Sequence, residues 1–148
     1  MIAPPPAERL SLNTATVREQ WNLRQMIEAC ARHGIRGISP WRDKLDELGV
    51  QQAARLIRQH ELTVTGLCRG GMFPAADAAG RQAAIDDNRR AIDDAATIGA
   101  RCLVLVVGGL PAGSKDLAGA RQMVVDGIAA VLGHARASGV PLAIEPLH

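Results

Sequence analysis

The chain has 148 residues, of which 47% are hydrophobic and 22% charged, and its formal net charge is +2. This length and apolar fraction predict one folded domain spanning residues 1–148 and exclude an intrinsically disordered chain. The 17 basic and 15 acidic residues are scattered along the sequence, so no basic stripe indicates a nucleic-acid partner. No apolar run reaches the 18 or so residues of a membrane span, so we expect no membrane association.

The first residues and the cysteines indicate the compartment. Residues 1–9 contain neither a basic n-region nor an apolar h-region, so we expect a disordered N-terminal extension rather than a secretory signal. Cys30, Cys68 and Cys102 are widely spaced and form no CxxC pair, which argues against a disulfide framework or a zinc knuckle. We therefore expect reduced thiols and a cytoplasmic protein.

Strand and helix candidates alternate in chain order. The strand candidates are residues 10–13, 37–41, 62–67, 102–107 and 142–145. The helix candidates have apolar residues at helical spacing and span residues 23–33, 50–60, 81–98 and 116–137. The uninterrupted apolar run at 102–107 is typical of a parallel strand that is covered on both faces.

This alternation predicts parallel βαβ units with right-handed crossovers. The strand candidates recur about every 33 residues, close to the roughly 31 residues per unit of an eightfold barrel. The expected fold is therefore α/β, of the (β/α)8 TIM-barrel type, present as a partial barrel of about five strands and four helices. An open doubly wound sheet is the alternative, although Asn13-Thr14-Ala15-Thr16 stands where a dinucleotide-binding sheet would have its glycine-rich turn.

Both folds place their sites at the carboxyl ends of the strands. The polar residues at these ends form a candidate rim that is suited to binding a metal and a small molecule. They are Asn13, Trp41, Arg42, Asp43, Cys68, Arg69, Glu145 and His148.

Four segments resemble one known family. They are Leu-Ser-Leu-Asn-Thr at 10–14, Gly-Ile-Ser-Pro-Trp at 37–41, Leu-Val-Leu-Val-Val-Gly-Gly at 103–109 and Ile-Glu-Pro-Leu-His at 144–148. Together they resemble the xylose-isomerase-like sugar phosphate isomerase/epimerase family over essentially the whole chain, but over only the first five of that family's eight strands. The Glu-Pro-Leu-His element is the most specific of the four.

The resemblance implies a divalent-metal-dependent isomerase or epimerase of a sugar or sugar phosphate, which transfers a proton through an enediolate intermediate. In the family, the glutamate that ends the fifth strand binds Mn²⁺, Mg²⁺, Co²⁺ or Zn²⁺ and acts as an acid/base, and Glu145 is the matching residue. A carboxylate suits both roles, because one oxygen can bind the metal while the other reaches a carbon-bound proton. The family's other ligands come from strands six to eight, so we expect an incomplete metal site in this chain.

The predicted site residues have structural alternatives. We favour a catalytic and metal-binding Glu145 over a core ion pair, because an unpaired carboxylate in an apolar strand is costly. Asn13, Trp41, Arg69 and His148 are the predicted substrate contacts. Trp41 either walls a sugar pocket or packs under the rim, and His148 either contacts substrate or belongs to a terminal tail. Arg69 either meets a phosphate or carboxylate in an anion-binding turn or lies in a flexible loop.

Three other features are ambiguous. Residues 108–114 form either a phosphate cradle before a helix or a mobile active-site loop. Arg42 and Asp43 either bind substrate or lie in a solvated loop. The histidines at 33, 60 and 134 fall at predicted helix ends, where an imidazolium favours the helix dipole, so we interpret them as structural.

Two classes of function follow from these observations. The first is the metal-dependent isomerase or epimerase with a small carbohydrate substrate. The second is a catalytically inactive half-barrel that needs another chain, because a five-strand arc exposes strand edges and apolar interior and so favours homo-oligomers. The family also includes endonucleases that act at abasic sites, but the near-neutral charge offers little attraction for a DNA backbone.

Overall fold

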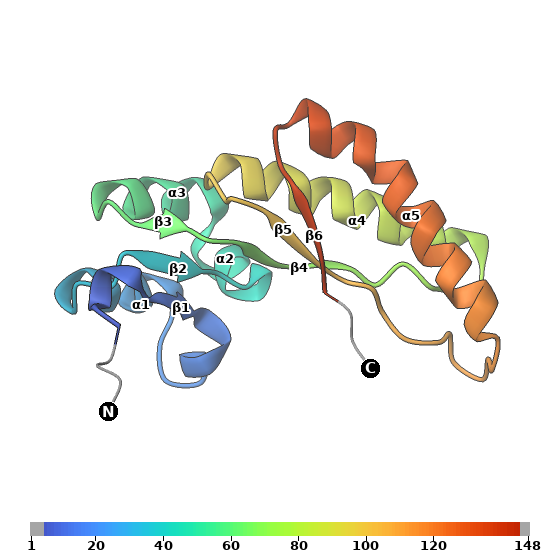
Figure 1. The fold of residues 1–148 in the computed structure, drawn as a ribbon, viewed down its shortest axis with the longest axis horizontal. Coiled ribbons are helices and arrows are strands. Elements are labelled where there is room, and N and C mark those ends of the chain that lie inside the picture. Colours follow the sequence, from blue (N-terminus) through green and yellow to red (C-terminus); the bar gives the residue numbers. More distant parts are fainter. Residues whose placement is uncertain (1–4, 146–148) are drawn as a thin grey trace. The chain divides into compact units, whose positions relative to one another are not determined.

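The computed structural model describes residues 5–145, which form two compact units (Figure 1). Residues 5–68 and 97–101 belong to the first unit, and residues 69–96 and 102–145 belong to the second. Parallel strands alternate with helices along the chain, which confirms the predicted partial (β/α) barrel. Within the described residues, no helix is long and apolar enough to cross a membrane.

The first unit contains a small parallel sheet with the order β1-β2-β3. Its strands are β1 (Ser11–Asn13), β2 (Gly37–Ser39) and β3 (Thr63–Val64). Its helices are α1 (Leu23–Arg32), α2 (Arg42–Leu48) and α3 (Val50–Gln59), with 3-10 turns η1 (Ala7–Arg9) and η2 (Thr14–Val17). Ile38 pairs with Leu12 on one side and Val64 on the other, and it is fully buried at the centre of this sheet.

Helices α1 and α3 of the first unit begin and end within a residue of the predicted bounds. Asn22 caps α1, because its side chain accepts from the Gln25 amide while the Gln25 side chain accepts from the Asn22 amide. His33 and His60 are the C-cap residues of α1 and α3, at the helix ends where the sequence predicts them. The apolar faces of these helices form the core of this unit: Leu23, Met26, Ile27, Ala53, Ala54 and Ile57.

The second unit is built around a parallel sheet with the order β4-β5-β6. Its elements are β4 (Leu67–Gly71), α4 (Ala78–Thr97), β5 (Leu103–Val106), α5 (Leu117–Ala137) and β6 (Leu142–Glu145). Leu103 and Leu105 are fully buried, as expected for a parallel strand that is covered by helices. His134 lies in the last turn of α5, with Nε2 2.7 Å from Oδ1 of Asp93 on α4.

The third predicted strand, residues 62–67, is wrong in its extent. The structure has two short strands there, β3 and then β4, and β4 continues through the segment that was expected to be a turn or loop at Arg69. Gly70 is needed in this strand because a Cβ there would meet Asn88, Leu103 and Leu105 at 3.0 Å or less. Gly70 thus permits close packing inside a strand instead of marking a turn or loop at Arg69.

Two further differences concern short elements. Arg42 and Asp43 lie in helix α2 and not in a loop; this helix has seven residues and a single buried side chain, Leu45, so it shows little apolar periodicity. The expected disorder of residues 1–9 does not extend to Ala7–Arg9, which forms η1. Cys30, Cys68 and Cys102 are not joined in disulfide bonds.

Candidate functional site

Two of the predicted substrate contacts meet in the first unit. Asn13 ends β1, and its Oδ1 accepts hydrogen bonds from the Ala15 amide at 3.0 Å and from Nε1 of Trp41 at 2.9 Å. The hydroxyl of Thr14, which is fully buried, accepts from the backbone N–H of Trp41 at 2.9 Å. The indole and the backbone of Trp41 are therefore both held by the residues that follow β1.

One face of the Trp41 ring is covered by a cation. The Arg18 guanidinium carbon lies 5.7 Å from the ring centroid, within the range of a cation–π contact. The same guanidinium forms an ion pair with Asp43, with Nη2 2.6 Å from Oδ2. Stacking of a sugar on this ring face would require Arg18 to move. Arg18 could not be predicted as a neighbour of Trp41, because nothing in the sequence spacing links the two residues.

In the second unit, strand register places Arg69 and Glu145 on one face of the sheet. Glu145 pairs with Val106, and paired residues of parallel strands point to the same face. A Cβ at Gly70 would contact Leu105, so Gly70 and Leu105 face the same side, toward α4. The residues that alternate with them, Arg69 and Val106, therefore face the other side, together with Glu145.

Glu145 is exposed at the end of β6. Among residues 5–145 it has no ion-pair partner, so the alternative of a core ion pair is not what the structure shows. Water reaches the Glu145 side chain, so the expected cost of burying this carboxylate does not apply. His148 lies outside the described residues.

Arg69 also lines a cavity of about 510 Å³. The cavity lies beside the ends of β4 and β5 and the first turns of α5. Its lining residues are Arg69, Met72, Pro74, Val106, Val107, Gly108, Gly109, Leu110, Leu117, Ala120, Arg121 and Val124. Arg121 was not predicted as a site residue, because it lies on α5 outside the apolar stripe on which the helix was recognised.

The predicted phosphate cradle at 108–114 has no free helix terminus behind it. The side chain of Asp116 caps α5 by accepting a hydrogen bond from the Gly119 amide at 2.8 Å. A carboxylate thus already occupies the position that an anion would take at this N-terminus. Of the two interpretations of residues 108–114, the structure favours the loop.

The described part of the chain does not form a complete metal site. Between residues 5 and 145 no three His, Cys, Asp or Glu side chains come close enough together to hold a metal ion. Divalent metals in proteins usually take at least three protein ligands. Among residues 5–145, Glu145 has no further ligand side chains close enough to form such a set.

The parallel strands, covering helices and polar strand ends define a protein of the (β/α) barrel class. The family model of the xylose isomerase-like TIM barrel matches residues 27–148, and the chain belongs to this family. No curated protein matches the sequence.

Three solved structures support the same fold. The protein SMc04130 from Sinorhizobium meliloti 1021 is 61% identical, with a TM-score of 0.94 over 96% of this chain and 52% of its own. D-psicose 3-epimerase from Clostridium cellulolyticum H10, solved with D-tagatose, is 15% identical, with a TM-score of 0.78 over 93% of this chain and 52% of the epimerase chain. The IolI protein with a zinc atom is 24% identical, with a TM-score of 0.79 over 90% of this chain and 50% of the IolI chain. The chain spans about half the length of each of these proteins.

Proposed function

We propose that this chain supplies part of the active site of a divalent-metal-dependent isomerase or epimerase that acts on a sugar or sugar phosphate. The observation that carries the proposal is the position of Glu145, an exposed carboxylate at the carboxyl end of β6. It is not engaged in an ion pair with any other described residue, so it is available to a substrate. The solved structures that share the fold of this chain include a D-psicose 3-epimerase.

In this proposal, Glu145 removes a proton from the carbon next to a substrate carbonyl and returns it to the adjacent carbon through an enediolate. Arg69, on the same sheet face, holds an anionic or oxygen-rich part of the substrate. A divalent metal, when bound, would polarise the carbonyl. Glu145 is the proposed ligand from this chain, and the rest of the ligand set is not found among the described residues.

Proton exchange in deuterated water tests the role of Glu145. The chain is incubated with ketohexoses and ketose phosphates and millimolar Mn²⁺, and loss of the carbon-bound proton next to the carbonyl is followed by NMR. We expect exchange that falls by about 100-fold or more in Glu145→Gln, the usual contribution of a general acid/base. Glu61→Gln, at an exposed glutamate in the first unit, is the matched control and should keep the full rate. Exchange that is no faster than in buffer, or equal in Glu145→Gln, would contradict the proposal.

A second candidate is a half-barrel scaffold that has no activity by itself and needs another chain. Ile144 of β6 favours it, because 57% of this apolar residue is exposed and β6 pairs with β5 as its one neighbour among the described strands. For a scaffold, Mn²⁺ should bind the chain and its Glu145→Gln variant equally weakly, as measured by calorimetry. A micromolar or tighter site that Glu145→Gln abolishes would count against the scaffold and in favour of the enzyme.

A further inference from the structure

The cavity of the second unit combines two features that together indicate a ligand. Its volume of about 510 Å³ lies within the range of small-molecule sites, roughly 300–1,000 Å³. Its lining residues include two arginines, Arg69 and Arg121, and no acidic residue.

Both arginines are available to an anion. Arg69 and Arg121 are exposed, and neither is joined to a carboxylate within the described range 5–145. Most arginines on α4 are different in this respect, since Arg89 and Arg90 pair with acidic residues one turn away. Two unpaired guanidinium groups that line one cavity favour a carboxylate or phosphate, which they can bind through charge-assisted hydrogen bonds.

The remaining lining is strongly apolar. Met72, Leu110 and Leu117 have exposed fractions of 47%, 44% and 52%, and they are three of the seven large hydrophobic residues that are exposed in the described part of the chain. Their gathering at one cavity is unusual, because exposed apolar side chains are normally scattered singly. An apolar part of a ligand would remove this surface from water.

The backbone around the cavity is held in place. The Met72 amide donates to the Val106 carbonyl at 2.8 Å, which joins the end of β4 to β5. Gly108 has a φ of +93° and lies so close to Met72 and Pro74 that a Cβ would approach both to 3.1 Å. The floor of the cavity therefore exists before any ligand binds, and the cost of ordering it on binding is small.

We infer that this cavity binds a small organic anion, whose carboxylate or phosphate meets Arg69 and Arg121 and whose carbon chain lies against Met72, Leu110 and Leu117. Arg69 lines the cavity and Glu145 does not, so the inference rests on the proposed function only in taking Arg69 as a substrate contact. The binding itself requires neither Glu145 nor a metal.

Amide NMR of the 148-residue chain tests the inference directly. Hexanoate, hexyl phosphate and uncharged hexanol are titrated separately, and the amide shifts of Met72, Gly108 and Gly109 are followed. We expect saturable shifts with one or both anions and much weaker binding of hexanol. The two anionic probes distinguish a carboxylate site from a phosphate site.

Substitutions assign the binding to the arginines. Arg69→Gln and Arg121→Gln should each weaken binding about tenfold or more, and the double variant should abolish it. Arg136→Gln, at an exposed arginine in the last turn of α5 outside the cavity, is the matched control and should bind normally. The titrations contain no metal and follow no proton exchange, which separates failure of this inference from failure of the proposed function. Absence of saturable binding, or binding that survives in the double variant, would overturn the inference.

Discussion

At the end of β4, a single buried carboxamide joins strand and helix. Asn88 of α4 accepts from the Gly71 amide at 2.6 Å, and its Nδ2 donates to the carbonyls of Gly71 and Ala84 at 2.8 Å each. Asn88 is 1% exposed, so water cannot replace these bonds. This side chain holds the strand that carries Arg69. In the sequence it stands as a lone polar residue on the apolar face of a helix, which was the available signal for its role.

Replacing Asn88 with alanine should lower the free energy of unfolding by about 2–4 kcal/mol, because two buried backbone groups of Gly71 lose their partner. Urea unfolding measures the change. Gln82→Ala on the exposed side of α4 is the control and should change stability by less than about 0.5 kcal/mol. A loss below about 1 kcal/mol for Asn88→Ala would show that Gly71 does not depend on this side chain.

The cysteines should differ in reactivity. Burial raises the pKa of the Cys30 thiol, so a smaller fraction is present as the reactive thiolate. We expect iodoacetamide at about pH 8 to label Cys30 many times more slowly than Cys102, which is half-buried, with mass spectrometry reporting both sites. Equal rates for the two thiols would mean that the core around Cys30 opens readily.

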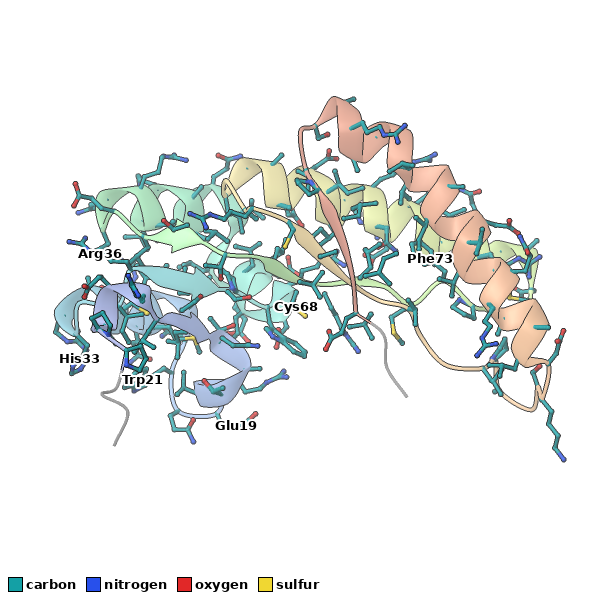
Figure 2. The ribbon with its side chains drawn as sticks, in the orientation of Figure 1. Glu19, Trp21, His33, Arg36, Cys68 and Phe73 are labelled. Carbon is teal, nitrogen blue, oxygen red and sulfur yellow. The ribbon has the colours of Figure 1, made fainter. Side chains whose placement is uncertain are left out.

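At the scale of elements, two glycines inside α5 have opposite surroundings. Gly127 is buried, and a Cβ there would overlap the ring of Phe73. Figure 2 labels Phe73 beside α5. Gly133 lies on the same helix with open space around its Cα. Helix propensity alone would assign the same gain to alanine at both positions.

Gly127→Ala should therefore destabilise the protein by about 1–3 kcal/mol through overpacking, whereas Gly133→Ala should stabilise it by up to about 1 kcal/mol. Thermal unfolding followed by circular dichroism compares the two variants with the parent chain. A stabilised Gly127→Ala would show that Phe73 can move aside without cost.

At the scale of the whole molecule, the outer strand β6 is only partly covered. Ile144 pairs in register with Leu105, so the two side chains point to the same face of the sheet. Leu105 is fully buried, whereas 57% of Ile144 is exposed. An exposed apolar residue on an edge strand favours association with another chain.

We expect the 148-residue chain to self-associate, with an average mass above 15.7 kDa that rises with concentration in light scattering. Ile144→Lys should bring the mass back toward the monomer, since a charge blocks pairing at this edge. Val125→Lys replaces another exposed apolar residue, on α5, and should leave the association unchanged. A strictly monomeric parent chain would contradict this expectation.

Much of the fold could be predicted from the sequence. The long helices α1, α3, α4 and α5 and the strand β5 follow from apolar periodicity, which is a local property because burial repeats with the period of the element. The helix α2 and the division into β3 and β4 could not be predicted, since the former is too short for periodicity and the latter contains glycines that only tertiary packing explains.

The candidate site divides in the same way. The positions of Asn13, Trp41 and Glu145 at or just beyond strand ends follow from the order of elements along the chain. Three relations needed the folded structure: Asn13 bonds to Trp41, Arg69 shares a sheet face with Glu145, and Arg69 and Arg121 line one cavity. The physical reason is that strand register and helix packing join residues far apart in the chain, and no local pattern specifies which of them meet.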